Sequence, residues 1–313
     1  MLKSGSTARH PFTSLLLLVL LMFAGALLFT ILAAIVVIAM YGFKPLMGIS
    51  SGEGFSIEAI RILQIFTSTG MFIAPALFFA KLESQNWIAY LKLKGFPIVL
   101  VLLTVLIMLS SAPMLEWSSD LNKNMKFPGF LKDLEEWMLL KEREMAVMTK
   151  QLLKMESVPV LFINILMLAI IPAIGEEFIF RGCLQKIFAR WTINKHAAIW
   201  ITAIIFSAIH FQFYGFIPRM LLGALFGYLL VWSGSLWIPI LAHFMNNFVA
   251  VITAYVYQQK GISLDKLDQP VHISTILYIL SFLACSALLW TFYTTSLKFR
   301  LNQVKQTDGS RLD

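Results

Sequence analysis

Six polar or charged side chains within apolar stretches of the second half of the chain have types and spacings suited to chemistry. They form three motifs: Glu-Glu-x-x-x-Arg at Glu176, Glu177 and Arg181, Phe-x-x-x-His ending at His210, and His-x-x-x-Asn at His243 and Asn247. A charged side chain near the centre of a bilayer costs about 2.5 to 3.5 kcal/mol on insertion scales, so an ionisable residue there is a candidate for function.

Helix geometry gives the two adjacent glutamates different surroundings. Successive residues on a helix diverge by about 100°, so Glu176 and Glu177 cannot face the same direction. Glu177 and Arg181 are four residues apart on one face, where an ion pair would neutralise both charges. We therefore expect Glu176 to be the carboxylate that faces a reaction partner, and Glu177 and Arg181 to support it.

The other two motifs can meet this carboxylate if their polar residues lie at the same depth. At about 1.5 Å per residue, Glu176 and His210 each lie roughly 21 Å from the ends of their predicted helices on the same side of the membrane. His243 and Asn247 share one helix face and lie roughly 12 and 18 Å from the start of theirs. The spacing thus predicts that three helices converge on one polar pocket.

A pocket of this composition is suited to amide hydrolysis. Attack by water requires removal of a proton, and a carboxylate in apolar surroundings holds a proton more strongly and is a better base. The tetrahedral intermediate requires hydrogen-bond donors, which a histidine and an asparagine can supply as an oxyanion hole.

The elements that position these residues are predicted to be membrane helices. Of the 313 residues, 58% are hydrophobic and 13% charged, which is typical of a chain with lipid as its solvent. A helix needs about 20 apolar residues to cross the hydrocarbon core. Eight candidate spans are predicted, at residues 13–41, 57–80, 96–115, 157–190, 196–213, 216–233, 235–258 and 272–297.

The predicted fold class is therefore an all-α, polytopic helical membrane protein with about eight transmembrane helices around a polar intramembrane cavity. We divide the chain into an N-terminal membrane scaffold (1–156), a catalytic core (157–255), and a last transmembrane helix with a cytoplasmic tail (256–313). The scaffold includes a long loop, 116–156, whose apolar residues recur at helical spacing. That loop is expected to hold an amphipathic helix on the membrane surface or on the spans beneath it.

The chain has a formal charge of +8, and the distribution of its positive residues predicts its orientation in the membrane. Lysine and arginine gather in the short loops on the side of the N-terminus and in the C-terminal tail. By the positive-inside rule, both termini are expected in the cytoplasm of a multi-pass cell-membrane protein. This distribution argues against a nucleic-acid partner. The two cysteines, Cys183 and Cys285, lie far apart in apolar segments, so a disulfide framework is not expected.

The motifs resemble the CPBP intramembrane proteases, also called the Abi family, which include the CAAX endopeptidases that trim prenylated proteins. The resemblance covers roughly residues 157 to 255 and rests on the three motifs in this order. It implies eight helices around a cavity, in which Glu176 and His210 activate a water while His243 and Asn247 stabilise the oxyanion. The partners implied are the lipid bilayer and a peptide or membrane-protein substrate, including lipid-modified ones.

Metal dependence has two alternatives. Glu176, His210 and His243 form a two-histidine, one-carboxylate set, which several zinc peptidases use as ligands, so one zinc ion is a reasonable cofactor. Zinc would take Glu176 as a ligand and would then need another group as general base. The remaining carboxylate, Glu177, is directed toward Arg181, so the zinc site would lack its base. His-Glu-x-x-His, which supplies ligands and base from one helix, is absent. We therefore favour a mechanism with no cofactor and keep the zinc protease as the alternative.

Two functions from other classes remain open. Intramembrane Glu and His residues also form proton relays in transporters, but the sequence has no detectable inverted repeat. A non-catalytic immunity protein is also compatible with the family resemblance.

Overall fold

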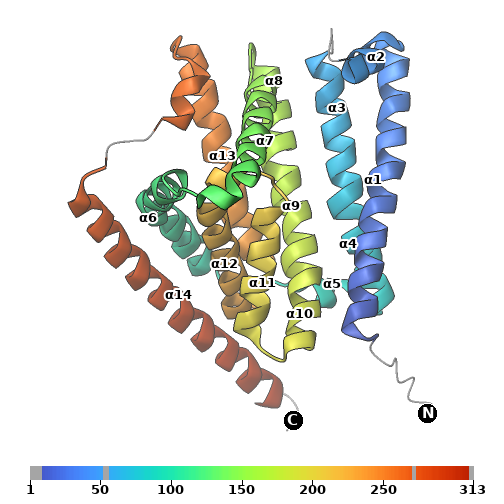
Figure 1. Cartoon of the computed structure of the whole chain (residues 1–313). Helices are drawn as coiled ribbons and strands as arrows, with labels where there is room; N and C mark the ends of the chain where they lie inside the picture. Colours follow the sequence, from blue (N-terminus) through green and yellow to red (C-terminus); the bar gives the residue numbers. More distant parts are fainter. Residues whose placement is uncertain (1–8, 52–55, 270–272, 310–313) are drawn as a thin grey trace. The chain divides into compact units, whose positions relative to one another are not determined.

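The computed structural model describes residues 9–51, 56–269 and 273–309, and these residues form helices without any strand among them (Figure 1). The predicted all-α fold is therefore confirmed. Seven helices in the described part of the chain are long and apolar enough to cross a membrane, so the protein is an integral, multi-pass membrane protein. They run Pro11–Tyr41, Ile57–Glu83, Ile98–Lys123, Val158–Thr192, Phe213–Ser233, Trp237–Gln259 and Thr275–Asn302.

The predicted span at 196–213 differs from the others. Its helix, α11, covers only Lys195–Ala208, 14 residues, which gives a length of about 21 Å against a hydrocarbon core of about 30 Å. The chain turns after Ala208 because Phe211 has a positive φ of 53°, which ends the helical hydrogen-bond pattern. His210 therefore lies in a turn just beyond a helix, not inside one as expected. The predicted side of the two termini stays a prediction, because it requires α11 to cross the membrane.

The chain forms two compact units, which are described separately. Unit 1 consists of Met1–Leu93 with Ile170–Thr202, and unit 2 of Lys94–Ala169 with Ala203–Asp313. The division into three domains predicted from the sequence, with boundaries after residues 156 and 255, is a different division from these two units and stays a prediction. The predicted first residue of the last span, 272, and both ends of the chain lie outside the described residues.

Unit 1 contains the N-terminal helices and the second part of the long helix 158–192. Its elements are α1 (Pro11–Tyr41), α2 (Lys44–Ser51), α3 (Ile57–Ser68), the π-helical turn η1 (Thr69–Ile73), α4 (Ala74–Glu83), α5 (Trp87–Leu91), α9 (Ile171–Glu177), the π-helical turn η4 (Phe178–Leu184) and α10 (Gln185–Thr192).

Close backbone contacts hold the helices of unit 1 together. Gly25 of α1 lies against the backbone of Gly70 in η1, and neither position has room for a Cβ atom. A Cβ on Gly175 in α9 would lie 2.8 Å from the Cβ of Phe72. Small residues at such crossings let membrane helices approach closely, where van der Waals packing has to replace the hydrophobic effect. The helix that carries Glu176 is thereby packed directly on η1.

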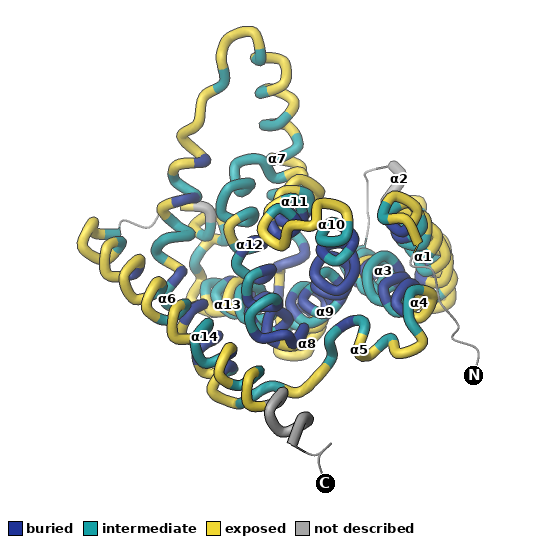
Figure 2. The backbone as a smooth tube through the Cα atoms, turned by 90° about the horizontal axis from the view of Figure 1, so that it is seen from below, coloured by how far each residue is buried: buried dark blue, intermediate teal, exposed yellow. Residues whose placement is uncertain are grey.

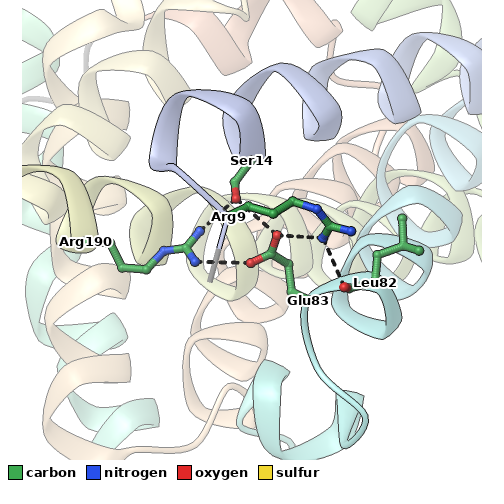
Figure 3. Close-up of polar contacts among 5 residues, drawn as sticks. All are labelled: Arg9, Ser14, Leu82, Glu83 and Arg190. Atoms are coloured by element: carbon green, nitrogen blue, oxygen red, sulfur yellow. Dashed lines mark hydrogen bonds and ion pairs between the residues drawn. The ribbon is translucent and has the colours of Figure 1, made fainter. Parts of the chain in front are cut away.

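A buried carboxylate joins α1, α4 and α10 at one end of unit 1 (Figure 3). Glu83, whose side chain is 4% exposed, accepts hydrogen bonds of 3.1 Å from Arg9 and from Arg190, one at each carboxylate oxygen. The buried Ser14 hydroxyl donates to Glu83 at 3.1 Å and accepts from Arg190 at 3.0 Å. All of these donors are therefore directed at one acid, which fixes Arg190 near the end of the helix that carries Glu176.

Unit 2 contains the remaining helices around an apolar core. Its elements are α6 (Ile98–Lys123), η2 (Gly129–Leu131), α7 (Lys132–Leu152), α8 (Val158–Asn164), the π-helical turn η3 (Ile165–Ile170), η5 (Phe213–Gly215), α12 (Phe216–Ser233), α13 (Trp237–Gln259), η6 (Leu264–Asp268) and α14 (Thr275–Gly309), with α11 entering it from unit 1. Leu103, Phe226, Ile238 and Phe292 are among the core residues, from α6, α12, α13 and α14. Most residues along the outer face of α14 are exposed, as expected of a surface that faces lipid (Figure 2).

The amphipathic helix predicted in the loop 116–156 is α7. Beyond its C-terminal end, Gln258 of α13 accepts a hydrogen bond from the Met155 amide at 2.8 Å and donates to the Leu153 carbonyl at 2.9 Å. Lys150 pairs with Asp265 at 2.9 Å, and the hydrogen bonds from Lys150 and Ser263 lower the pKa of that carboxyl. The end of α7 is therefore attached to α13 and to the segment that follows it.

The network around Glu83 predicts a loss of stability on removing its charge. Glu83→Gln keeps the shape of the side chain but leaves two guanidinium groups without a charged acceptor. Since Arg9 and Arg190 are 39% and 32% exposed, water compensates in part, and we expect a loss of roughly 1–3 kcal/mol. Thermal unfolding of the purified protein in detergent measures it.

Glu136→Gln is the matched control, because Glu136 pairs with Lys132 in an exposed position on α7. We expect its midpoint to equal that of the unmodified protein. Equal midpoints for both variants would show that the Glu83 network contributes nothing to stability.

Candidate active site

The Glu-Glu-x-x-x-Arg motif lies on one long helix, with its two glutamates between two π-helical turns and Arg181 within the second turn. The expectation that the fourth span is long is confirmed, since the helix runs from Val158 to Thr192. Glu176 and Glu177 end α9, with η3 before it and η4 after it. Single π-helical turns within α-helices are rare overall. Where they occur they are often at functional sites, because they alter side-chain directions and free backbone carbonyls.

The predicted pair of Glu177 and Arg181 is present. Arg181 Nη1 donates to Glu177 Oε1 at 2.6 Å, and the two side chains are 0% and 1% exposed. A single buried charge would be costly, but the pair is a short, charge-assisted contact that brings both charges inside together. Glu176, its neighbour, is more exposed than Glu177, which agrees with the two carboxylates facing different directions.

His210 lies in the turn after α11, and the backbone selects the tautomer of its ring. Its Nδ1 lies 2.7 Å from the Phe206 carbonyl oxygen. Because a carbonyl oxygen can only accept, Nδ1 carries the hydrogen, and in the neutral imidazole Nε2 is then the proton-accepting atom. The four-residue spacing in Phe-x-x-x-His therefore has a physical reason. It places the His210 ring within hydrogen-bonding distance of the Phe206 carbonyl in the last turn of the helix.

His243 is buried in α13 between two aromatic rings. It is 4% exposed, stacks on Phe226 with ring centroids 5.4 Å apart, and meets Phe206 edge to face at 5.9 Å. Phe206 also contacts His210, at 5.1 Å between centroids. The two histidines predicted from separate motifs are thus neighbours of one phenylalanine, which gives Phe206 a place in the site that the motif alone did not explain.

The amide of Asn247 is oriented by two hydrogen bonds. Its Nδ2 donates to the Leu168 carbonyl in η3 at 3.1 Å, and its Oδ1 accepts from Asn246 Nδ2 at 3.1 Å. The π-helical turn supplies the acceptor, because the change in backbone pairing there leaves carbonyls available to side chains. Since the amide nitrogen carries two hydrogens, one remains in addition to the bond to Leu168.

Within unit 2 the structure therefore brings together His210 and His243 through Phe206, and Asn247 lies one helical turn beyond His243 on α13. Glu176, Glu177 and Arg181 belong to unit 1. The convergence of Glu176 with the two histidines stays a prediction from the sequence.

The zinc alternative also stays open. Among the described residues no three His, Cys, Asp or Glu side chains gather as a metal site. The proposed ligands Glu176, His210 and His243 are divided between the two units, so their mutual geometry does not decide the question.

Comparison with known proteins agrees with the motifs. Residues 158–249 match the family model for type II CAAX prenyl endopeptidase Rce1-like proteins, and all six predicted site residues lie within that segment. YpbD, an uncharacterized protein of Bacillus subtilis (strain 168), is 29% identical over 126 residues, which are 39% of this chain and 58% of YpbD. No solved structure matches significantly. The resemblance to this protease family is therefore confirmed, over the segment that carries the motifs.

Sequence reasoning missed several contributors to this region. The π-helical turns have no sequence signal that we recognise. Asn246 stands next to a motif residue and orients it, which helix spacing alone did not indicate.

The contrast between the two glutamates predicts different effects on stability. Glu177→Gln leaves the fully buried Arg181 without its carboxylate, which should cost about 3–5 kcal/mol. Glu176→Gln, at a more exposed position, is the matched variant and should unfold close to the unmodified protein. Thermal unfolding of the purified variants compares them, and an equal loss in both would contradict the division between a supporting and a reacting carboxylate.

Proposed function

We propose that this protein is an intramembrane endopeptidase in which Glu176 and His210 activate a water molecule and His243 and Asn247 stabilise the oxyanion. The match of residues 158–249 to the Rce1-like family carries the proposal, because that segment contains every residue to which we assign a role. The family is one of prenyl endopeptidases by its description, and the seven apolar helices agree with a substrate met in the membrane.

In this mechanism the water oxygen attacks the carbonyl carbon of the scissile peptide bond, and its proton passes to the Glu176 carboxylate. The contrast between the two carboxylates supports this role of Glu176, since Glu177 is fully buried against Arg181 while Glu176 is more exposed. The same proton then passes to the leaving nitrogen as the carbon–nitrogen bond breaks, so the enzyme returns to its starting state.

His210 accepts a hydrogen bond from the attacking water through Nε2. The support for this assignment is the contact between Nδ1 and the Phe206 carbonyl, which requires the ring hydrogen on Nδ1 and leaves Nε2 as the acceptor. The imidazole orients the water, while the carboxylate takes its proton.

The oxyanion that forms on the substrate carbonyl is stabilised by His243 and Asn247. The amide of Asn247 is held in one orientation before the reaction, by Leu168 on one side and Asn246 on the other. Donors that are fixed in advance stabilise developing charge without reorganisation during the reaction. The stacking of His243 on Phe226 restrains its ring in the same way.

The substrate class that fits the proposal is a peptide or membrane protein, including one with a lipid attached near the bond that is cut. The lipid bilayer is the other partner. We place the protein in the cell membrane with both termini in the cytoplasm, on the distribution of lysine and arginine in the sequence.

Hydrolysis by purified protein in lipid nanodiscs tests the proposal. The probes are a fluorescent peptide that ends in a farnesylated cysteine followed by three residues, and the same peptide without the lipid. Replacing the base should remove at least two to four orders of magnitude of rate, so we expect Glu176→Gln to abolish measurable cleavage of the farnesylated peptide. Glu58→Gln, an exposed glutamate at the start of α3, is the control and should cleave at the unmodified rate.

Three other results would change the assignment. Full cleavage by the Glu176→Gln variant would remove Glu176 from the mechanism. Stoichiometric zinc, whose removal by a chelator abolishes cleavage and whose return restores it, would replace the metal-free mechanism by the zinc alternative with the same residues. Absence of cleavage of both peptides, and an unchanged membrane peptidome between cells with the native chain and with Glu176→Gln, would favour an immunity or transport role.

A further inference from the structure

The turn that carries His210 has a strained backbone. The His210 and Phe211 amides donate to the carbonyls three residues before them, Ser207 and Ala208, at 3.3 and 3.2 Å, and Phe211 has a φ of 53°. A left-handed conformation at a residue other than glycine is unfavourable and persists only where the surroundings hold it. The position of His210 therefore depends on whatever fixes the residues that follow it.

One side chain from another helix binds the backbone at two places after this turn. Asn122, near the end of α6, donates through Nδ2 to the Phe213 carbonyl at 3.0 Å and accepts through Oδ1 from the Ile217 amide at 2.7 Å. The Ile217 amide belongs to the first turn of α12, where backbone N–H groups have no partner within the helix. Asn122 thus caps α12 and holds η5 with a single planar group that is 6% exposed.

Other contacts also hold this segment, among them a 2.7 Å hydrogen bond from the buried Ser207 hydroxyl to the Phe216 carbonyl. The Tyr214 amide donates to Glu142 of α7 at 3.3 Å, and Trp137 of α7 packs on Phe213 with centroids 5.4 Å apart. A cavity of about 130 Å³ adjoins Asn122, Phe213 and Ile217 and is otherwise lined mainly by apolar and aromatic side chains. Water could enter this cavity and satisfy the backbone if Asn122 were lost, so the fold would survive. Water would not fix the turn.

We propose that Asn122 is a positioning residue, which sets the place of His210 by clamping the segment from Phe213 to Ile217. The inference rests on the proposed function for its catalytic consequence. Its structural part, that Asn122 restrains the turn, stands independently. Asn122 does not touch the reacting atoms in this account; it acts through the backbone that leads to His210.

The test compares Asn122→Ala with Asn124→Ala, both in the full chain in nanodiscs. Asn124 is the matched control, because its exposed side chain bonds to the Asp120 carbonyl at the end of the same helix. Displacement of a catalytic group by about 1 Å can cost on the order of 100-fold in rate. For Asn122→Ala we therefore expect kcat on the farnesylated peptide to fall by about 10- to 100-fold. Its KM should stay within about twofold, because substrate binding does not depend on how well the reacting groups are aligned. Asn124→Ala should match the unmodified protein in both.

Hydrogen exchange at residues 209–217 gives a second readout that needs no activity. Asn122→Ala should exchange these amides faster than Asn124→Ala, with similar thermal midpoints. Unchanged exchange in Asn122→Ala, or faster exchange with an unchanged kcat, would overturn the positioning role. If the unmodified chain cleaves neither peptide, the proposed function fails, while faster exchange would still support the clamp on the turn.

Discussion

A polar side chain inside the hydrocarbon layer must find its partners within the protein, and the structure around the site follows from that requirement. Glu177 and Arg181 enter the apolar interior as a pair at 2.6 Å, neither exposed by more than 1%. Either charge alone would be strongly destabilising, so the position of one determines the other. The helix that contains them is fixed at two further places, Gly175 on η1 and Arg190 on Glu83, and Glu176 lies between these anchors.

The same requirement acts on the polar groups of unit 2. Each of His210, Asn247 and Asn122 has a backbone carbonyl as a partner, at Phe206, Leu168 and Phe213. These carbonyls lie at a helix end, a π-helical turn and a short 3₁₀ segment, where regular helical pairing is interrupted. Irregular backbone is therefore what orients the candidate catalytic side chains. It is tolerated at membrane depth because it is buried in protein.

Much of this arrangement could be predicted from the sequence. Long apolar runs are sufficient to identify membrane helices, and all seven long spans fall where the runs are. The i, i+4 spacing predicted the contact between Glu177 and Arg181 and the shared face of His243 and Asn247, because helical periodicity fixes both. The motifs then led to the family resemblance that the comparison confirms over residues 158–249.

The remaining features depend on contacts that no local pattern encodes. Apolar residues continue past Ala208, so hydropathy could not show that α11 ends there; a positive φ at Phe211 ends it. Glu83 lies just beyond the predicted span at 57–80, and only the folded chain brings Arg9 and Arg190 to it. Asn122 lies 91 residues from Phe213, a separation at which spacing carries no information.

The proposed mechanism requires Glu176 of unit 1 and His210 of unit 2 to face the same small volume, and proximity cross-linking measures this directly. Glu176→Cys is combined with His210→Cys, or with the control His196→Cys at the exposed start of α11, in a chain whose Cys183 and Cys285 are replaced by alanine. Each double variant is treated in nanodiscs with a short bifunctional thiosulfonate and analysed by intact mass. The account predicts one bridging reagent per chain for the 176/210 pair and two separate additions for the 176/196 pair. Two separate additions for both pairs would show that the carboxylate and the imidazole do not share a site.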